Sequence, residues 1–205
     1  MNNVFPLFST PLQLGHILWE RLLKKDDLVI DATMGNGKDT LMLARILSKC
    51  GSGKVIALDI QAKALENTLK LLTERIPEFL QNIDLRRISH ENFPIEILPA
   101  SVKLIVYNLG YLPGADKQLT TKTETTLVSI QKALELIAPG GVLSVTCYPG
   151  HAEGLKEYEA IKAFVRELDT REFCVSEHLW PGRTLSPVLL FIQKNNHPLK
   201  PSLLQ

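Results

Sequence analysis

Short apolar runs rich in Val, Ile and Leu alternate along the chain with stretches in which apolar residues recur at helical spacing. The first pattern predicts buried β-strands and the second predicts amphipathic helices. The expected strands are 27–32, 53–59, 83–88, 102–108, 141–147, 173–178 and 188–194. The expected helices are 10–24, 38–50, 61–76, 124–137 and 153–168.

This order of elements predicts an α/β, Rossmann-like fold. Five strand-then-helix units form a mostly parallel sheet with helices on both faces. The last two strands follow each other without a helix, so we expect a seven-stranded sheet whose last strand is antiparallel. No linker or repeat divides the chain, which predicts a single domain over 1–205, with a leading helical segment (1–26) and a flexible tail (195–205). Ligands of such sheets bind outside the carboxyl ends of the strands.

Composition and charge narrow the function classes. The chain has 23 Lys and Arg against 22 Asp and Glu, a formal net charge of +1, so bulk charge does not bind it to nucleic acid. Any RNA must be held by a local patch or a shaped site. Cys50, Cys147 and Cys174 form no Cys-x-x-Cys pair, which predicts a reducing, cytoplasmic location and no metal site. Residues 1–10 do not read as a secretory signal, and no apolar run reaches the roughly 20 residues that span a bilayer, so we expect no membrane partner.

A glycine-containing loop follows the first expected strand. Gly35 and Gly37 allow a tight turn that brings the backbone and the next helix's N–H groups close to a ligand. Asp59 ends the second strand, where an acid can accept hydrogen bonds from ribose hydroxyls. Taken alone, the glycine turn is better explained as a tight connection between strand and helix.

Three cofactors could use this loop. A phosphate-binding P-loop needs Gly-Lys-Ser/Thr, and Gly37-Lys38-Asp39 breaks that pattern. A dinucleotide site favours a small residue where Thr40 stands, and Asp31 at the strand end would repel a pyrophosphate. S-adenosylmethionine has no phosphate and carries a sulfonium and an ammonium group, so an acid at this place attracts it. The loop therefore favours S-adenosylmethionine.

The segment 29–43 resembles the first motif of class I S-adenosylmethionine-dependent methyltransferases. The sequence Asp-Ala-Thr-Met-Gly-Asn-Gly-Lys-Asp-Thr at 31–40 more narrowly resembles the rRNA methylase family, whose members are similar to tRNA 5-aminomethyl-2-thiouridine methyltransferases acting at the wobble uridine. The similarity runs through nearly the whole chain and includes 89–92, 108–114 and 148–151. The segment 108–114, Asn-Leu-Gly-Tyr-Leu-Pro-Gly, is the most specific of these.

The resemblance implies S-adenosylmethionine as the cofactor and RNA, through a tRNA anticodon loop, as the partner. The residues it assigns to the methionine end of the cofactor are Asp31, Thr33, Gly35, Asn36, Gly37, Asp39 and Thr40. Those it assigns to the ribose and adenine are Asp59, Ile60 and Gln61, with His90, Glu91 and Asn92 near the adenine. By themselves, His90 and Glu91 fit the polar start of a helix equally well.

The acceptor is expected after the fourth strand. Methyl transfer is an in-line displacement at a sulfonium, so the site must align a neutral lone pair and needs no strong base. The side-chain oxygen of Asn108 and the carbonyl of Leu109, next to Gly110, could aim the N–H groups of an amine, and Tyr111 could stack on a base. The segment resembles the Asn/Asp-Pro-Pro-Tyr motif of amino methyltransferases, but Leu109-Gly110 replaces the two prolines. A turn cap at Asn108 and a packed Tyr111 are the structural alternative.

Two further loops should face the same cleft. Tyr148 is expected near the substrate, and His151 could accept the released proton, contact a nucleotide or cap the next helix. Trp180 and Arg183 lie between the last two strands and suit base stacking and phosphate contact. A turn with Trp180 packed on the sheet edge explains them nearly as well.

The function we expect from the resemblance is N-methylation of the 5-aminomethyl group at the tRNA wobble position, with the base turned out of its stack. Methylation of rRNA or of a small metabolite stays open. Carbon-5 methylation of a pyrimidine is a further alternative, suggested by Cys147, because that chemistry needs a thiolate. A cofactor-binding module without catalysis is disfavoured, since both ends of the site look intact. A homodimer that helps to hold the RNA is left open.

Overall fold

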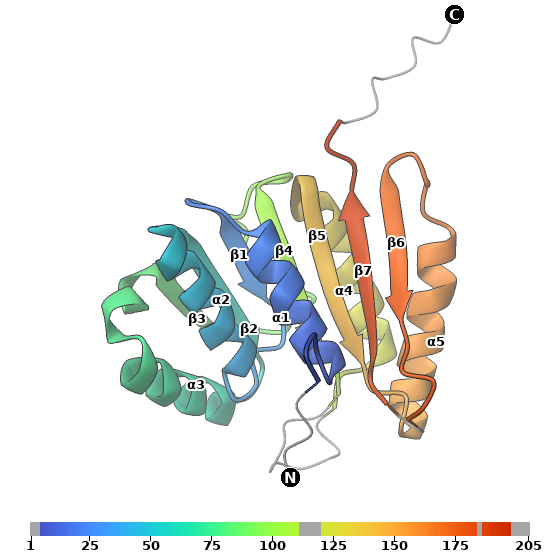
Figure 1. Cartoon of the computed structure of the whole chain (residues 1–205), viewed down its shortest axis with the longest axis horizontal. Coiled ribbons are helices and arrows are strands. Elements are labelled where there is room, and N and C mark those ends of the chain that lie inside the picture. Colours follow the sequence, from blue (N-terminus) through green and yellow to red (C-terminus); the bar gives the residue numbers. More distant parts are fainter. Residues whose placement is uncertain (1–4, 111–119, 184–185, 198–205) are drawn as a thin grey trace, which may run out of the picture.

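The structure is a computed structural model that describes residues 5–110, 120–183 and 186–197. Its centre is a seven-stranded sheet in the order β3-β2-β1-β4-β5-β7-β6 (Figure 1). Neighbouring strands from β3 to β5 are parallel, and β7 runs antiparallel to both β5 and β6. The predicted α/β sheet with an antiparallel last strand is confirmed. The strands are β1 (Leu28–Asp31), β2 (Lys54–Asp59), β3 (Ile83–Arg87), β4 (Val102–Asn108), β5 (Ile137–Cys147), β6 (Phe173–His178) and β7 (Val188–Lys194).

Helices cover both faces of the sheet. Successive strand residues point to opposite faces, so Val29 packs in one apolar cluster with Trp19, and the next residue, Ile30, packs in the other with Ile130. The first cluster lies under α1, α2 and α3, and the second lies under α4 and α5. Within the described ranges, no helix has the length and apolar character needed to cross a membrane. The helices are α1 (Pro11–Leu22), α2 (Lys38–Cys50), α3 (Ala62–Arg75), α4 (Thr123–Leu136) and α5 (Ala152–Arg166), with a 3-10 helix η1 (Pro77–Asn82).

The sheet reverses its strand order next to β1. This strand lies between β2 and β4, and the helix after β1 covers one face while the helix after β4 covers the other. The chains that leave the two carboxyl ends therefore diverge and open a crevice between them. This crevice positions the site.

Two parts of the predicted element order are wrong. No helix follows β3, because residues 88–101 form turns in which Pro94 and Pro99 remove backbone donors while Ile97 is buried in the core. Strand β5 begins at Ile137, before the predicted start, and runs through a proline and Gly140, which has a φ of 68°. The pairing of β4 with β5 shifts register there, which lets the strand accommodate both residues.

A substitution of Gly37, at the start of α2, tests how tightly the glycine loop packs against α3. Gly37 has a φ of 77°, and a Cβ would lie 2.8 Å from two side-chain atoms of Thr68 on α3. Gly37→Ala should therefore lower the free energy of unfolding by about 2–4 kcal/mol, from backbone strain and overpacking together. Gly51→Ala is the matched control, since Gly51 has a φ of 102° but no atom within 4 Å of its Cβ position, and it should lose only the strain contribution. Denaturant unfolding that shows equal losses for the two variants would contradict this packing.

Candidate active site

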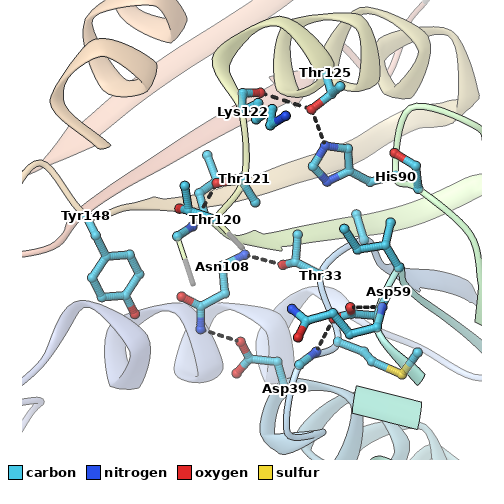
Figure 2. A pocket seen from close by; sticks show the side chains of 18 of the residues that line it. Thr33, Asp39, Asp59, His90, Asn108, Thr120, Thr121, Lys122, Thr125 and Tyr148 are labelled. Carbon is cyan, nitrogen blue, oxygen red and sulfur yellow. Dashed lines mark hydrogen bonds between the residues drawn. The ribbon is translucent and has the colours of Figure 1, made fainter. Parts of the chain in front are cut away.

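A large cavity opens at the carboxyl ends of β1, β2, β3 and β4 (Figure 2). Its volume of about 990 Å³ lies at the upper end of the roughly 300–1,000 Å³ range of ligand pockets, so it can hold more than a small metabolite. Its walls come from the loop after β1, the ends of β2, β3 and β4, residues 120–125 and the loop after β5.

Most of the predicted site residues line this cavity. Those that do are Thr33, Gly35, Asn36, Asp39, Asp59, Ile60, Gln61, His90, Glu91, Asn108, Leu109, Gly110, Tyr148 and His151. Those that do not are Asp31, Gly37, Thr40, Asn92, Trp180 and Arg183. Tyr111 lies outside the described residues. The loops that follow β1, β2, β3, β4 and β5 are all expected at the crevice, and each of them contributes residues to this cavity.

The glycine loop is held from below by α3. Gly35 has a φ of 50°, and its carbonyl accepts a hydrogen bond from the Thr68 hydroxyl at 3.1 Å. The amide of Asn67 donates to the side-chain oxygen of Asn36 at 2.9 Å. These contacts fix the loop so that it lines the cavity without a ligand to order it.

Asp59 joins the glycine loop to the end of β2. Its two carboxylate oxygens accept the backbone N–H groups of Gly35, at 3.0 Å, and of Gln61, at 2.9 Å. Burial raises the pKa of Asp59, and the backbone N–H groups of Gln61, Gly35 and Ile60 oppose that rise. Each oxygen keeps a second lone pair, so the carboxylate can still accept from hydroxyl groups in the cavity.

Asp31 lies beneath the loop and not in the cavity wall. It is 1% exposed, and it accepts hydrogen bonds from the Thr40 hydroxyl at 2.6 Å and from the Thr33 N–H at 3.2 Å. Burial, together with the nearby carboxylate of Asp39, raises its pKa to about 7. Asp31 is therefore not part of the cavity wall; it holds the Thr40 hydroxyl, and its direct contact with a cofactor stays a prediction.

Asp39 connects the two ends of the cavity. One of its oxygens lies 2.8 Å from Nε2 of His16 on α1, and the other accepts the side-chain amide of Asn108 at 3.2 Å. Burial, reinforced by the carboxylate of Asp39, raises the pKa of Tyr148 to about 12, so its hydroxyl stays protonated at neutral pH. Figure 2 shows Asn108 between Tyr148 and Asp39.

The backbone after β4 is fixed at the acceptor end. The N–H of Asn108 donates to the Thr33 hydroxyl at 2.7 Å, and the N–H of Gly110 donates to Oγ1 of Thr121 at 2.9 Å. Gly110 has a φ of 124°, which a residue with a side chain rarely adopts. Thr121 in turn donates to the buried carboxylate of Glu157 at 2.9 Å. The replacement of two prolines by Leu109-Gly110 is therefore compensated by a hydrogen-bonded turn.

His90 closes the cavity on the β3 side. It is 9% exposed, and burial lowers its pKa, so its ring is neutral at neutral pH. Its Nε2 lies 3.4 Å from the hydroxyl of Thr125 at the start of α4 (Figure 2). Asn92 does not line the cavity and is exposed.

His151 occupies the N-cap of α5. Its Nδ1 accepts the N–H of Gly154 at 3.1 Å. Of the three roles that the sequence suggests for His151, this is the helix cap. In a neutral ring the proton then sits on Nε2, so neither nitrogen is a free acceptor while the cap holds. This geometry disfavours His151 as a general base.

Trp180 and Arg183 lie in a second, smaller hollow. Trp180 packs edge-on against Phe8 with ring centroids 6.1 Å apart, and Arg183 donates to the carbonyl of Ser9 at 2.8 Å. Both residues thus contact the segment that precedes α1, and not the main cavity.

Sequence reasoning missed three residues that support the site. His16 and Thr121 gave no local signal, since each acts through a partner far along the chain. Glu157 did give a signal: it falls on the buried face of α5 with Tyr158 and Ile161, where an acid needs partners. Those partners are the hydroxyls of Thr121 and Thr126.

The fold and the cavity define the class of protein. A Rossmann-like sheet with an antiparallel β7, a glycine loop after β1 and an acid at the end of β2 make the chain a class I S-adenosylmethionine-dependent methyltransferase. Residues 55–194 match the family described as "Putative rRNA methylase", and the chain belongs to this family.

Individual relatives agree with this membership. The chain is 36% identical over 192 residues to the "tRNA (mnm(5)s(2)U34)-methyltransferase, chloroplastic" of Arabidopsis thaliana, covering 90% of this chain and 69% of the relative. It is similar to a structure described as a "putative rRNA-methylase" of Clostridium thermocellum, with a TM-score of 0.84, 34% identity and coverage of 91% of this chain and 98% of that one. A "putative methyltransferase" of Streptococcus mutans in complex with SAH gives a TM-score of 0.79 and 33% identity, covering 91% and 99%.

The raised pKa of Asp31 predicts an unusual pH dependence of stability. Its pKa is about 7 in the folded protein and near the ordinary value of 3.8 in the unfolded chain, so the folded state holds the extra proton between these values. Stability should therefore fall as pH rises through this window. Asp31→Asn should remove that slope and raise the Tm at about pH 8, measured by thermal unfolding without ligand.

Asp84→Asn is the control with the opposite sign. The hydrogen bond from Arg86 lowers the pKa of Asp84, so this carboxylate stabilises the folded state above its unfolded pKa, and its variant should lose stability at about pH 8. Equal pH slopes for the wild type and Asp31→Asn would contradict the assignment.

Proposed function

We propose that the protein methylates the amine of 5-aminomethyl-2-thiouridine at the wobble position of tRNA, using S-adenosylmethionine. The observation that carries this proposal is the amide of Asn108 at the end of β4, which donates to the carboxylate of Asp39 and lies beside Tyr148 in the cavity wall. The name of the Arabidopsis relative, a tRNA methyltransferase for a uridine at position 34, supports the same substrate class.

The residues of the cavity suit S-adenosylmethionine. Asp39 and Asp59 line it and Asp31 lies beneath it, so this end favours a cation and disfavours a pyrophosphate. Asp59 would accept the ribose hydroxyls, the loop at Gly35 and Asn36 would face the methionine end, and His90 and Glu91 would border the adenine. When bound, the cofactor supplies the methyl group on its sulfonium and leaves as the neutral thioether.

The acceptor amine must be aimed and unprotonated. Nδ2 of Asn108 faces the Asp39 carboxylate, which can only accept, so its Oδ1 is the atom left to accept an N–H of the amine. Accepting that N–H directs the nitrogen lone pair toward the cofactor end. The amine loses one proton as its nitrogen gains the methyl group, and this proton can pass to water, since no described side chain is placed as a free base.

Recognition of the RNA falls to the cavity and its rim. With a net charge of +1 the chain has no bulk attraction for a polyanion, but Lys38 and Lys122 both line the cavity and are exposed. They would contact phosphates beside a uridine turned out of the anticodon loop. Binding at that loop, a cytoplasmic location and a homodimer stay predictions.

The carbon-5 alternative is disfavoured by the state of Cys147. The thiol is 1% exposed and does not line the cavity. Burial, reinforced by the carboxylates of Glu157 and Glu177, raises the pKa of Cys147 far above neutrality, so no thiolate forms. Methylation of an amine in rRNA would use the amide of Asn108 in the same way, so only an experiment distinguishes an rRNA substrate from a tRNA substrate.

The substrate is tested with RNA from cells that lack the protein. Purified protein is incubated with S-adenosylmethionine and either bulk tRNA or rRNA, and the nucleosides are analysed by mass spectrometry. We expect a methyl group on the amine of 5-aminomethyl-2-thiouridine and none in rRNA. Methylation confined to rRNA, or to carbon 5 of a pyrimidine, would refute the proposal.

Asn108→Ala tests the acceptor site. It removes the amide but keeps the backbone N–H that donates to Thr33, so kcat should fall about 100-fold while the Kd for S-adenosylmethionine changes little. Cys147→Ser should keep nearly full turnover. If Cys147→Ser abolishes turnover with cofactor binding intact, the carbon-5 mechanism is supported instead.

A further inference from the structure

His16 reaches the site from an element outside the nucleotide-binding core. Its Nε2 lies 2.8 Å from Oδ1 of Asp39, and its ring leans on Trp19 with centroids 4.8 Å apart. The His16 side chain is 27% exposed and that of Asp39 only 10%. His16 does not line the cavity, so it can act on the reaction only through Asp39.

The position of α1 is fixed at its N-terminal end and along its buried face. The Thr10 hydroxyl caps the helix by accepting the N–H of Gln13 at 3.2 Å, and Arg183 donates to the carbonyl of Ser9 just before it. Trp19 is 3% exposed and packs in the core under the helix. Helix α1 therefore holds His16 at Asp39 in a fixed position, because the helix cannot shift without breaking the contact at Ser9 or exposing Trp19.

A carboxylate with one partner can rotate, whereas one with a partner on each oxygen cannot. Asp39 holds Asn108 with Oδ2 and is itself held at Oδ1 by His16. Rotating a side-chain amide by 180° exchanges its oxygen and its NH2 group with almost no change in shape. In Asn108 this rotation would place N–H donors where the amine needs an acceptor. The orientation of Asn108 thus depends on a contact made on the far side of Asp39.

We propose that His16 is a positioning residue for methyl transfer, which locks the Asp39 carboxylate so that the Asn108 amide presents its oxygen to the acceptor amine. This role rests on the proposed function, since it assigns Asn108 to the amine. It needs only a hydrogen on Nε2, which both the neutral ring and the imidazolium can supply. It also gives Trp180 and Arg183 an indirect part, as anchors of the segment that leads into α1.

The test compares three substitutions of His16 in the full chain. His16→Ala should lower kcat about tenfold, with the KM for tRNA and the Kd for S-adenosylmethionine within about twofold of wild type. His16→Gln places an N–H at a similar reach and should restore most of the rate, whereas the shorter His16→Asn should not. Glu20→Ala is the matched control, because it breaks the exposed 3.0 Å ion pair of α1 with Lys49 on α2 and should leave kcat unchanged.

A second readout does not depend on the substrate. The side-chain amide resonance of Asn108, assigned by its absence in Asn108→Asp, should shift in His16→Ala and return in His16→Gln. If wild type fails to methylate the tRNA, the proposed function fails, and the resonance still tests the Asp39 relay. An unshifted resonance in His16→Ala, an unchanged kcat, or equal losses in the Gln and Ala variants would overturn the role of His16.

Discussion

Three carboxylates gather at one end of the cavity, and the rest of the site depends on how they are accommodated. Within the described part of the chain, Asp31 and Asp59 form no ion pair with Lys or Arg, and Asp39 is paired only with a histidine. The free-energy cost of burying these carboxylates close together is limited by hydrogen bonds from hydroxyl and backbone N–H groups. Asp31 also keeps its proton up to about pH 7, which removes its charge below that pH. A ligand with a positive charge would relieve the remaining repulsion. The electrostatics of the fold therefore select a cationic cofactor before any single contact is considered.

The same carboxylates couple the cofactor end to the acceptor end. Asp39 belongs to the glycine loop region by sequence, yet its Oδ2 orients Asn108, which stands at the end of β4. Asp59 likewise ties the tip of β2 to the loop after β1 through Gly35. Because neighbouring parallel strands end at one edge, short side chains are enough to make these links. Both ends of the cavity are thus tied to the loop region after β1 by hydrogen bonds to carboxylates.

Sequence spacing predicts those parts of the site whose residues lie close together in the chain. The glycine turn, the acid at the end of β2 and most of the alternation of strands and helices follow from spacing alone, whereas the missing helix after β3 and the early start of β5 do not. The contact of His16 with Asp39 spans 23 positions, and that of Asn108 with Asp39 spans 69. Such pairs depend on how α1 and β4 pack against the loop, which periodicity does not encode. For the same reason spacing does not reveal that Asp31 lies buried beneath the loop or that Trp180 packs against Phe8 near the start of α1.

Calorimetry with two nucleosides tests most directly whether the carboxylates read the charged end of the cofactor. S-adenosylmethionine carries a sulfonium and an ammonium group, whereas 5′-methylthioadenosine keeps the adenine and ribose but has neither charge. At about pH 7.5 we predict that S-adenosylmethionine binds at least about tenfold more tightly, which corresponds to about 1.4 kcal/mol. Equal affinities for the two compounds would contradict the account, since the carboxylates would then contribute nothing to the choice of cofactor.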